Sequence, residues 1–351
     1  MTHPLAGKRP DPATLVTRER MERAYLHPEG ELRPIKNGTS GHRGPTGVGF
    51  SERHVAAMTQ ALCDIRRERG TWGPAASDDP ATNLCHGLPG PIVLGKDVRF
   101  TSDLAQRTAV EVFAGNGLPV LIHRGGRATP TPVVSHAIVI GNEWGGNVEG
   151  AIVTASHNPP DDAGYKSNGM DGGPNTRTKP IDERANALLG DPSAIRRMDY
   201  DRAVREGLVI EVDLVLPYVQ DLVAVIDFDV LRGHRFAASP LGGSACGYYE
   251  AIAGHHDLEI EVVVGEPDPA SANRTYDWDG KLRGDPSSPW AMQAVAGHRE
   301  RLGVPLLGAN DNDADRFGAE DSTGVLNPNH VLCVLFDYLC THRSFDAAKG
   351  V

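Results

Sequence analysis

The sequence contains few cysteines, and they follow no disulfide or metal-binding pattern. There are five, an odd number, and none forms a C-x-x-C pair. This spacing disfavours a disulfide framework and a zinc site. We expect buried thiols instead, at Cys63, Cys85, Cys246, Cys333 and Cys340.

Long hydrophobic runs are also missing. No stretch approaches the roughly 18 uninterrupted apolar residues of a transmembrane helix, so we expect no membrane association. The first part of the chain carries Lys8, Arg9 and Pro10 where a secretory signal would have an apolar run. A cytoplasmic location is therefore predicted.

The chain has no excess of positive charge. With 35 Lys and Arg against 46 Asp and Glu, its net charge is −11, which argues against nucleic-acid binding. An anionic ligand must then bind where local cations and backbone amides override the overall field. The 40% of hydrophobic and 23% of charged residues are typical of a globular protein. A length of 351 residues predicts at least two domains.

Segments with strand and helix patterns alternate along the chain, which indicates an α/β fold. The polar stretch at 190–211 interrupts the pattern and is a candidate domain boundary. No internal repeat or low-complexity tract is evident. The predicted helices cover 51–70, 102–117, 131–140, 213–226, 247–253, 288–302 and 328–340. The predicted strands cover 91–95, 119–122, 150–154, 235–238, 258–264 and 304–309.

A serine follows the strand predicted at 150–154, where ligands bind in α/β sheets. Ser156 precedes His157, a possible acid or base, and Lys166 comes ten positions later, close enough to fold back over it. A serine hydroxyl needs a base or a metal to act as a nucleophile. The residue types alone are equally those of a capped turn.

Three aspartates follow the strand predicted at 304–309. Asp311, Asp313 and Asp315 alternate, so in an extended segment they point to one side and can hold Mg²⁺ or Ca²⁺. A calcium-binding EF-hand is disfavoured, because Arg316 and Ser322 stand where its glycine and glutamate are required. A solvated acidic turn remains the alternative for this segment taken alone.

Several motifs together resemble the α-D-phosphohexomutases. T-A-S-H-N-P-P at 154–160 with G-Y-K at 164–166 resembles their phosphoserine loop, and D-N-D-A-D-R at 311–316 their metal loop. G-T-S-G-H-R-G at 38–44 is similar to a segment near their start. G-K-D-V-R at 95–99 resembles a strand and turn that we interpret as structural, with Asp97 and Arg99 as a scaffold pair. Segments at 5–26 and 279–289 resemble bacterial phosphoglucomutases in particular.

The resemblance implies tandem layered α/β mutase domains with mixed sheets. Domain I at 1–205 would carry the phosphoserine loop and domain II at 206–318 the metal loop. A third domain, at 319–351, would be incomplete, since the sugar-reading loop and the C-terminal phosphate clamp of the family are missing.

The resemblance also implies a reaction and a set of site residues. The reaction is phosphoglucomutase isomerisation in carbohydrate metabolism, interconverting glucose 1-phosphate and glucose 6-phosphate through a phosphoserine. The cofactor is Mg²⁺, and glucose 1,6-bisphosphate is the intermediate and activator. The implied catalytic residues are Ser156, His157, Lys166 and Arg43. Those implied for hexose phosphate binding are Arg43, Lys166 and Arg316. Those implied for the metal are Ser156, Asp311, Asp313 and Asp315.

Two further questions stay open at the level of sequence. The missing segments would bind the sugar and its distal phosphate, and such remote binding energy positions the reacting oxygen. The alternative function is therefore a catalytically incomplete fragment that binds Mg²⁺, and sugar phosphate, without turnover. The sequence does not determine the oligomeric state.

Overall fold

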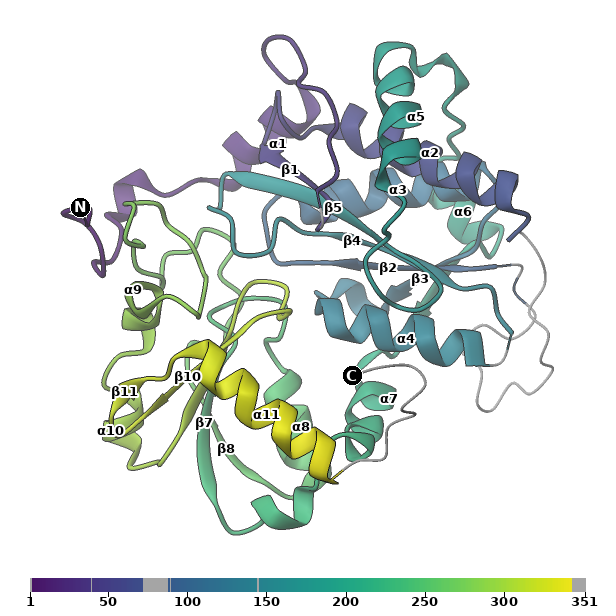
Figure 1. The fold of residues 1–351 in the computed structure, drawn as a ribbon. Helices are drawn as coiled ribbons and strands as arrows, with labels where there is room; N and C mark the ends of the chain where they lie inside the picture. The colour runs from purple at the N-terminus through teal and green to yellow at the C-terminus, as the bar shows by residue number, and fades with distance from the viewer. Residues whose placement is uncertain (1, 39, 72–87, 89, 144, 343–351) are drawn as a thin grey trace.

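The computed structural model describes residues 2–38, 40–71, 88, 90–143 and 145–342 and contains two mixed β-sheets, each flanked by helices (Figure 1). The α-helices are α1 (Arg18–Leu26), α2 (Glu52–Arg69), α3 (Ser102–Gly115), α4 (Thr131–Glu143), α5 (Thr178–Gly190), α6 (Tyr200–Arg205), α7 (Val215–Asp221), α8 (Tyr248–His256), α9 (Pro289–Met292), α10 (His298–Leu302) and α11 (Pro328–His342). The strands are β1 (His42–Pro45), β2 (Ile92–Lys96), β3 (Val120–His123), β4 (Glu149–Val153), β5 (Asp162–Asn168), β6 (Val209–Val212), β7 (Arg235–Ser239), β8 (Glu259–Val262), β9 (Leu307–Asn310), β10 (Phe317–Asp321) and β11 (Gly324–Val325).

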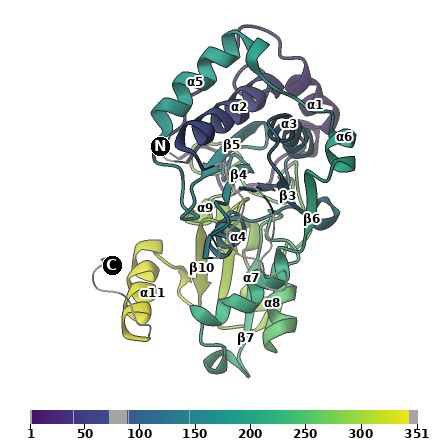
Figure 2. The same ribbon diagram turned by 90° about the vertical axis from the view of Figure 1, so that its right-hand side faces the viewer.

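The first sheet has the strand order β1-β5-β4-β2-β3-β6. The inner strands β4, β2 and β3 are parallel, apolar and buried, as a sheet covered on both faces requires. Along β2, Leu94 joins the core made with α2, α3 and α5, whereas Val93 joins the core made with α4. Figures 1 and 2 show these helices on opposite faces of the sheet.

The second sheet has the strand order β11-β10-β9-β7-β8, in which β7 is parallel to both β8 and β9. Its core includes Leu307 on β9 and Met292 on α9. Because β9 returns through β10 as an antiparallel neighbour, the loop between them lies at one end of this sheet. This loop carries the three aspartates predicted to bind a metal.

Helix α11 has no buried residue in the described part of the chain. Its large apolar side chains are exposed, and Figure 2 shows the helix standing away from the second sheet. The exposed side chains include Leu332, Val334, Leu335 and Phe336.

Most predicted elements are present near their predicted ranges, but some predictions were wrong. The single helix predicted at 288–302 is broken into α9, a 3₁₀ turn and α10, because Gly297 adopts a left-handed backbone (φ 74°). The helix predicted at 213–226 stops at Asp221 and continues as a 3₁₀ turn. The polar stretch at 190–211 contains α6 and most of β6.

The prediction of buried thiols holds only for Cys63. Cys246 is partly exposed and Cys333 and Cys340 are exposed on α11, so for them it was wrong. Cys85 lies outside the described residues, as does Thr39 of the glycine-rich segment. The four described cysteines are free thiols.

The domain boundaries remain a prediction. Strand β6 pairs with β3 and so extends the first sheet beyond residue 205. Strands β10 and β11 likewise extend the second sheet beyond residue 318. Judged by the sheets alone, both domain boundaries would therefore lie a few residues nearer the C-terminus than the predicted boundaries after residues 205 and 318.

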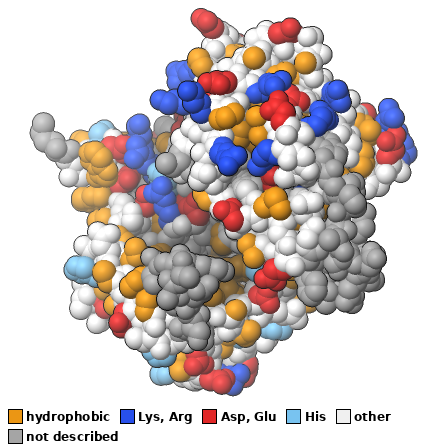
Figure 3. Space-filling view, turned by 45° about the vertical axis from the view of Figure 1, so that its right-hand side comes forward, with side chains coloured by type: hydrophobic (Ala, Val, Ile, Leu, Met, Phe, Trp, Pro, Cys, Tyr) orange, Lys and Arg blue, Asp and Glu red, His pale blue; other side chains and the backbone are white. Residues whose placement is uncertain are grey.

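The distribution of charge on the surface and the length of the helices bear on nucleic acid and membrane as partners. On the face shown in Figure 3, basic and acidic side chains are interspersed over the upper part of the molecule. Within the described ranges, no helix combines the length and apolarity needed to cross a bilayer.

Two stacked histidines, one on β1 and one on α2, make stability depend on pH. The rings of His42 and His54 lie 5.5 Å apart and nearly parallel, and both residues are buried. Burial lowers the pKa of His54 from 6.5 to about 4 and also lowers the pKa of His42. The unfolded chain takes up these protons first, so this stability is complete above pH 6.5 and is lost as the pH falls towards 4.

We expect His54 to contribute a loss of roughly 3 kcal/mol in the free energy of unfolding across this pH window. Urea denaturation at several pH values between neutral and acidic measures it. His54→Gln should flatten this part of the curve, whereas the same change at exposed His330 should leave it intact. An unchanged curve for His54→Gln would contradict the assignment.

Candidate active site

The serine loop joins β4 to β5 at the carboxyl end of a parallel strand. Ser156 lies in it with a left-handed backbone (φ 51°), which costs a non-glycine residue roughly 1 kcal/mol. Its amide donates to Thr154 Oγ1 at 2.8 Å, and the residue is fully buried. Strain of this kind persists only where the surroundings hold it, and it is common at active sites.

A buried arginine holds the carbonyl groups of the serine loop. Arg99 donates to the carbonyls of Ser156 and Asn158, each at 2.8 Å, and to that of Pro159 at 2.7 Å. Its Nε pairs with Asp97 Oδ2 at 3.0 Å. The predicted scaffold pair of Asp97 and Arg99 is thus present, and it braces the loop that carries Ser156.

Replacing Arg99 with methionine should destabilise the fold by about 3–5 kcal/mol, because it leaves Asp97 buried without its partner. Chemical denaturation measures the change. Arg202→Met removes an exposed pair with Glu206 and should cost under about 1 kcal/mol. An equal loss of unfolding free energy in Arg99→Met and Arg202→Met would show that Arg99 does not brace the loop.

The aspartate loop joins β9 to β10 and brings three carboxylates together. Each of Asp311, Asp313 and Asp315 offers an oxygen, and these oxygens lie within 4.8 Å of one another. The predicted reason for the convergence was wrong, because the segment is a turn with Ala314 at φ 57° rather than an extended run. Asp311 and Asp313 are 0% exposed, which excludes a solvated acidic turn, whereas Asp315 is exposed.

The two loops meet across the two sheets. Ser156 Oγ donates to Asp311 Oδ2 at 2.8 Å. Lys166 on β5 donates through Nζ to Asp313 Oδ2 at 2.5 Å and to Asp315 Oδ2 at 2.7 Å. The Ser156 hydroxyl and the three carboxylates, implied together as metal ligands, thus lie at one place, and Lys166, expected only near Ser156, lies among the carboxylates as well.

The pKa values of the ionisable groups at this junction are shifted in different directions. Burial, followed by the neighbouring Asp313 and Asp315, raises the pKa of Asp311 well above its ordinary value. Burial also acts to raise the pKa of Asp313, but the Lys166 ammonium outweighs it and holds that pKa low. The same two aspartates outweigh burial at Lys166 and raise its pKa, so the side chain stays protonated.

The donor set fits a hard divalent cation. One oxygen of Asp313, Oδ1, is buried and has no hydrogen-bond partner among the described residues, and the carboxylates of Asp311 and Asp315 lie close to it. Clustered carboxylate oxygens are the ligands that Mg²⁺ prefers, and a cation would relieve their mutual repulsion. Asp311, Asp313, Asp315 and the Ser156 hydroxyl are the residues that could hold it.

The other predicted site residues lie around this junction. His157 Nδ1 is 3.3 Å from Ser156 Oγ, and burial with the nearby Arg316 lowers the His157 pKa to about 4, so the ring is neutral at pH 7. Within the described residues, the hydrogen bonds of the Arg43 side chain on β1 are long, at 3.5 Å to Asn158 Oδ1 and to the Ser40 carbonyl.

Arg316, predicted to bind substrate, is already engaged. Its Nη1 pairs with Asp285 Oδ2 at 2.7 Å. Arg43 is therefore better placed to receive a new anion than Arg316 is.

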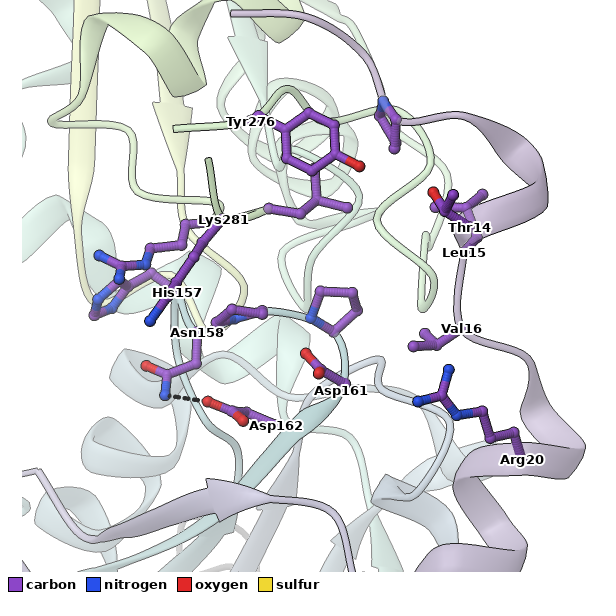
Figure 4. Close-up of a pocket in the computed structure, with 15 residues that line it drawn as sticks. Thr14, Leu15, Val16, Arg20, His157, Asn158, Asp161, Asp162, Tyr276 and Lys281 are labelled. Carbon is purple, nitrogen blue, oxygen red and sulfur yellow. Dashed lines mark hydrogen bonds between the residues drawn. The ribbon is translucent and has the colours of Figure 1, made fainter. Parts of the chain in front are cut away.

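Two cavities border the site. The larger, of about 600 Å³, has His157 and Lys281 side by side at one end and Arg20 at the other, with Asn158 bonded to Asp162 in its wall (Figure 4). A smaller one of about 150 Å³ reaches Lys166 and Asp315, among others. Neither is lined by Ser156, Asp311 or Asp313.

Two residues of the site were not predicted from the sequence. Thr131, at the start of α4, donates through Oγ1 to Asp313 Oδ2 at 3.0 Å and through its amide to the Asp313 carbonyl at 2.7 Å. Asp285 is the partner of Arg316. No local pattern marks Thr131, which meets Asp313 only because the two sheets are brought together.

Comparison with known proteins defines the class to which this fold and site belong. Residues 81–188 match the family described as phosphoglucomutase/phosphomannomutase, α/β/α domain I. This match and the relatives described below support the resemblance to the α-D-phosphohexomutases that the motifs predict, and the two mixed sheets agree with the predicted fold class.

The chain is similar over most of its length to phosphoglucomutases and phosphomannomutases. A phosphoglucomutase of Komagataeibacter xylinus is 36% identical over 99% of this chain and 62% of its own length. A probable phosphomannomutase of Haemophilus influenzae is 28% identical over 74% of this chain and 52% of its own. The crystal structure of a putative phosphomannomutase from Thermus thermophilus has a TM-score of 0.65 and 25% identity, covering 89% of this chain and 63% of that one. The chain thus spans about half to two thirds of the length of these proteins.

Proposed function

We propose that the chain carries the phosphoryl-transfer centre of a phosphoglucomutase, an isomerase that interconverts glucose 1-phosphate and glucose 6-phosphate. The contact of 2.8 Å between Ser156 Oγ and Asp311, inside the aspartate cluster, is the observation that supports it most. A serine oxygen beside a cation site and a protonated lysine is suited to carry and release a phosphoryl group.

The proposed reaction starts from phosphorylated Ser156. A sugar hydroxyl oxygen bonds to phosphorus while the bond from phosphorus to Ser156 Oγ breaks, giving glucose 1,6-bisphosphate. Neutral His157 accepts the hydroxyl proton and, from 3.3 Å, can return it to Ser156 Oγ. After the sugar turns, the other phosphate is transferred back to the serine by the reverse steps.

The cations of the site would neutralise the transferring group. Mg²⁺ held by Ser156 and the three aspartates would shield the charge of the phosphoserine. Lys166 stays an ammonium and so serves as a charge partner rather than a base. Arg43 is held by long hydrogen bonds of 3.5 Å in the described part of the chain, so its guanidinium could turn towards a phosphate oxygen.

Glucose phosphate is the proposed substrate, since the identity to a phosphoglucomutase, 36%, exceeds the 28% to the phosphomannomutase. Comparing glucose, mannose and glucosamine 1-phosphates in one assay should give the highest kcat/KM for glucose. We also propose a cytoplasmic location, where hexose phosphates are found.

The second candidate is a chain that binds Mg²⁺ and sugar phosphate without turnover. It is favoured by the coverage of only 62% of the Komagataeibacter protein. A coupled assay with glucose 1-phosphate, glucose 1,6-bisphosphate and Mg²⁺ separates the two, run on the chain alone and with the C-terminal part of that relative added. Turnover by the chain without any addition supports the first candidate. Turnover that requires the added C-terminal part supports the second. If neither sample turns over glucose 1-phosphate, the proposed function is overturned.

A further inference from the structure

A fully buried arginine lies directly behind the aspartate loop. Arg274 is 1% exposed and donates through Nε and Nη2 to the Leu241 carbonyl, at 3.1 and 2.9 Å. Nη2 also donates to the side-chain oxygen of Asn312, the residue between Asp311 and Asp313. Nη1 is buried without a partner, and within the described ranges the guanidinium forms no ion pair with a carboxylate.

Burying a guanidinium without a carboxylate partner is costly, so the surroundings must compensate for it. Burial, followed by nearby Arg99, lowers the Arg274 pKa to about 10, while Asp268 and Asp311 act in the opposite direction. Arg66 offers a contrast elsewhere in the fold. Arg66 is likewise buried, at 0% exposed, but its Nε lies 3.7 Å from Glu149 Oε2.

Arg274 is also packed against the segments that meet the site. A Cβ on Gly284 would lie 2.5 Å from Arg274 Nη1, and the Gly284 amide donates to the His157 carbonyl at 3.3 Å. On the other side, the Asn312 carbonyl accepts from the Ser244 amide at 2.7 Å. Arg274 therefore connects the backbone turn at Leu241, the aspartate loop and the segment next to the serine loop.

We propose that Arg274 is a positioning residue for the divalent-cation site: by holding the Asn312 side chain, it fixes the directions in which Asp311 and Asp313 present their carboxylates. This inference rests on the proposed function, because it concerns the cation that the site would hold. The Asn312 side chain bonds to Arg274, whereas the carboxylates of its two neighbours belong to the aspartate cluster, so anchoring Asn312 sets the turn of the loop.

The test is Mg²⁺ affinity of the whole chain, measured by titration calorimetry without substrate. Arg274→Lys keeps the charge but loses the fork that spans Leu241 and Asn312, and its Kd should rise about 10–100-fold. Arg66→Lys is the matched control: it should lower the melting temperature and leave the Kd unchanged. Asn312→Ala should raise the Kd for Mg²⁺ as Arg274→Lys does. It tests the same connection if Arg274→Lys fails to fold.

The double variant should be no weaker than the more damaged single variant, since both changes remove one connection. A melting temperature lowered in Arg274→Lys with a wild-type Kd would overturn the positioning role. So would a wild-type Kd in Asn312→Ala. If the wild-type chain binds no Mg²⁺, the proposed function fails and this inference fails with it, an outcome distinct from equal affinities in all variants.

Discussion

Replacing Ser156 with alanine should abolish mutase turnover. Alanine keeps the left-handed backbone at a similar strain but removes the oxygen that we propose carries the phosphoryl group between the two positions of the sugar. Loss of a covalent nucleophile commonly lowers kcat/KM by on the order of 10⁴-fold or more. The coupled glucose 1-phosphate assay, run under whichever condition gives wild-type turnover, measures the change.

Ser193→Ala is the matched control for this variant. Ser193 is exposed on a 3₁₀ turn remote in sequence from both loops, so its replacement should leave kcat/KM unchanged. Melting curves of both variants check that they fold. Wild-type turnover by Ser156→Ala would mean that the phosphoryl group travels by another route.

Replacing Asp313 with asparagine should weaken Mg²⁺ binding by on the order of 100-fold, because affinity for a hard cation depends on the number of charged oxygen ligands. Asp313 is fully buried, and its carboxylate accepts hydrogen bonds from Lys166 and Thr131. Asparagine preserves its shape and these hydrogen-bond acceptors in part, so the loss should come mainly from charge. Calorimetric titration of the chain with Mg²⁺ measures it.

Asp321→Asn provides the control for Asp313→Asn. Asp321 lies at the end of β10, partly exposed, with its carboxylate bonded to Thr323. Its replacement should leave Mg²⁺ affinity unchanged. Equal affinities for wild type and Asp313→Asn would show that the cation, if bound, lies elsewhere.

The two loops could be predicted from sequence because each is a contiguous motif after a strand. In an α/β fold such a position faces the ligand-binding edge, which placed Ser156 and the aspartates at strand ends. The path of the aspartate loop could not be predicted, since alternation along an extended segment and a turn with Ala314 left-handed both bring the carboxylates together.

Residues that act across the two sheets were beyond the reach of local patterns. Thr131 and Asp313 are separated by 182 positions, and nothing near Thr131 in the sequence marks it as a partner. Arg274 resembles any arginine in a polar loop until packing buries it behind Asn312. The break of the helix predicted at 288–302 could have been predicted more easily, because Gly297 interrupts the apolar pattern of the sequence.

The central claim is that the Ser156 hydroxyl and the carboxylates of Asp311, Asp313 and Asp315 surround one divalent cation. A crystal of the chain grown with Mn²⁺, with diffraction data collected at the manganese edge, tests this without requiring turnover. We predict a single strong anomalous peak enclosed by those four side chains. A peak at another place, or none at a saturating Mn²⁺ concentration, would contradict the account.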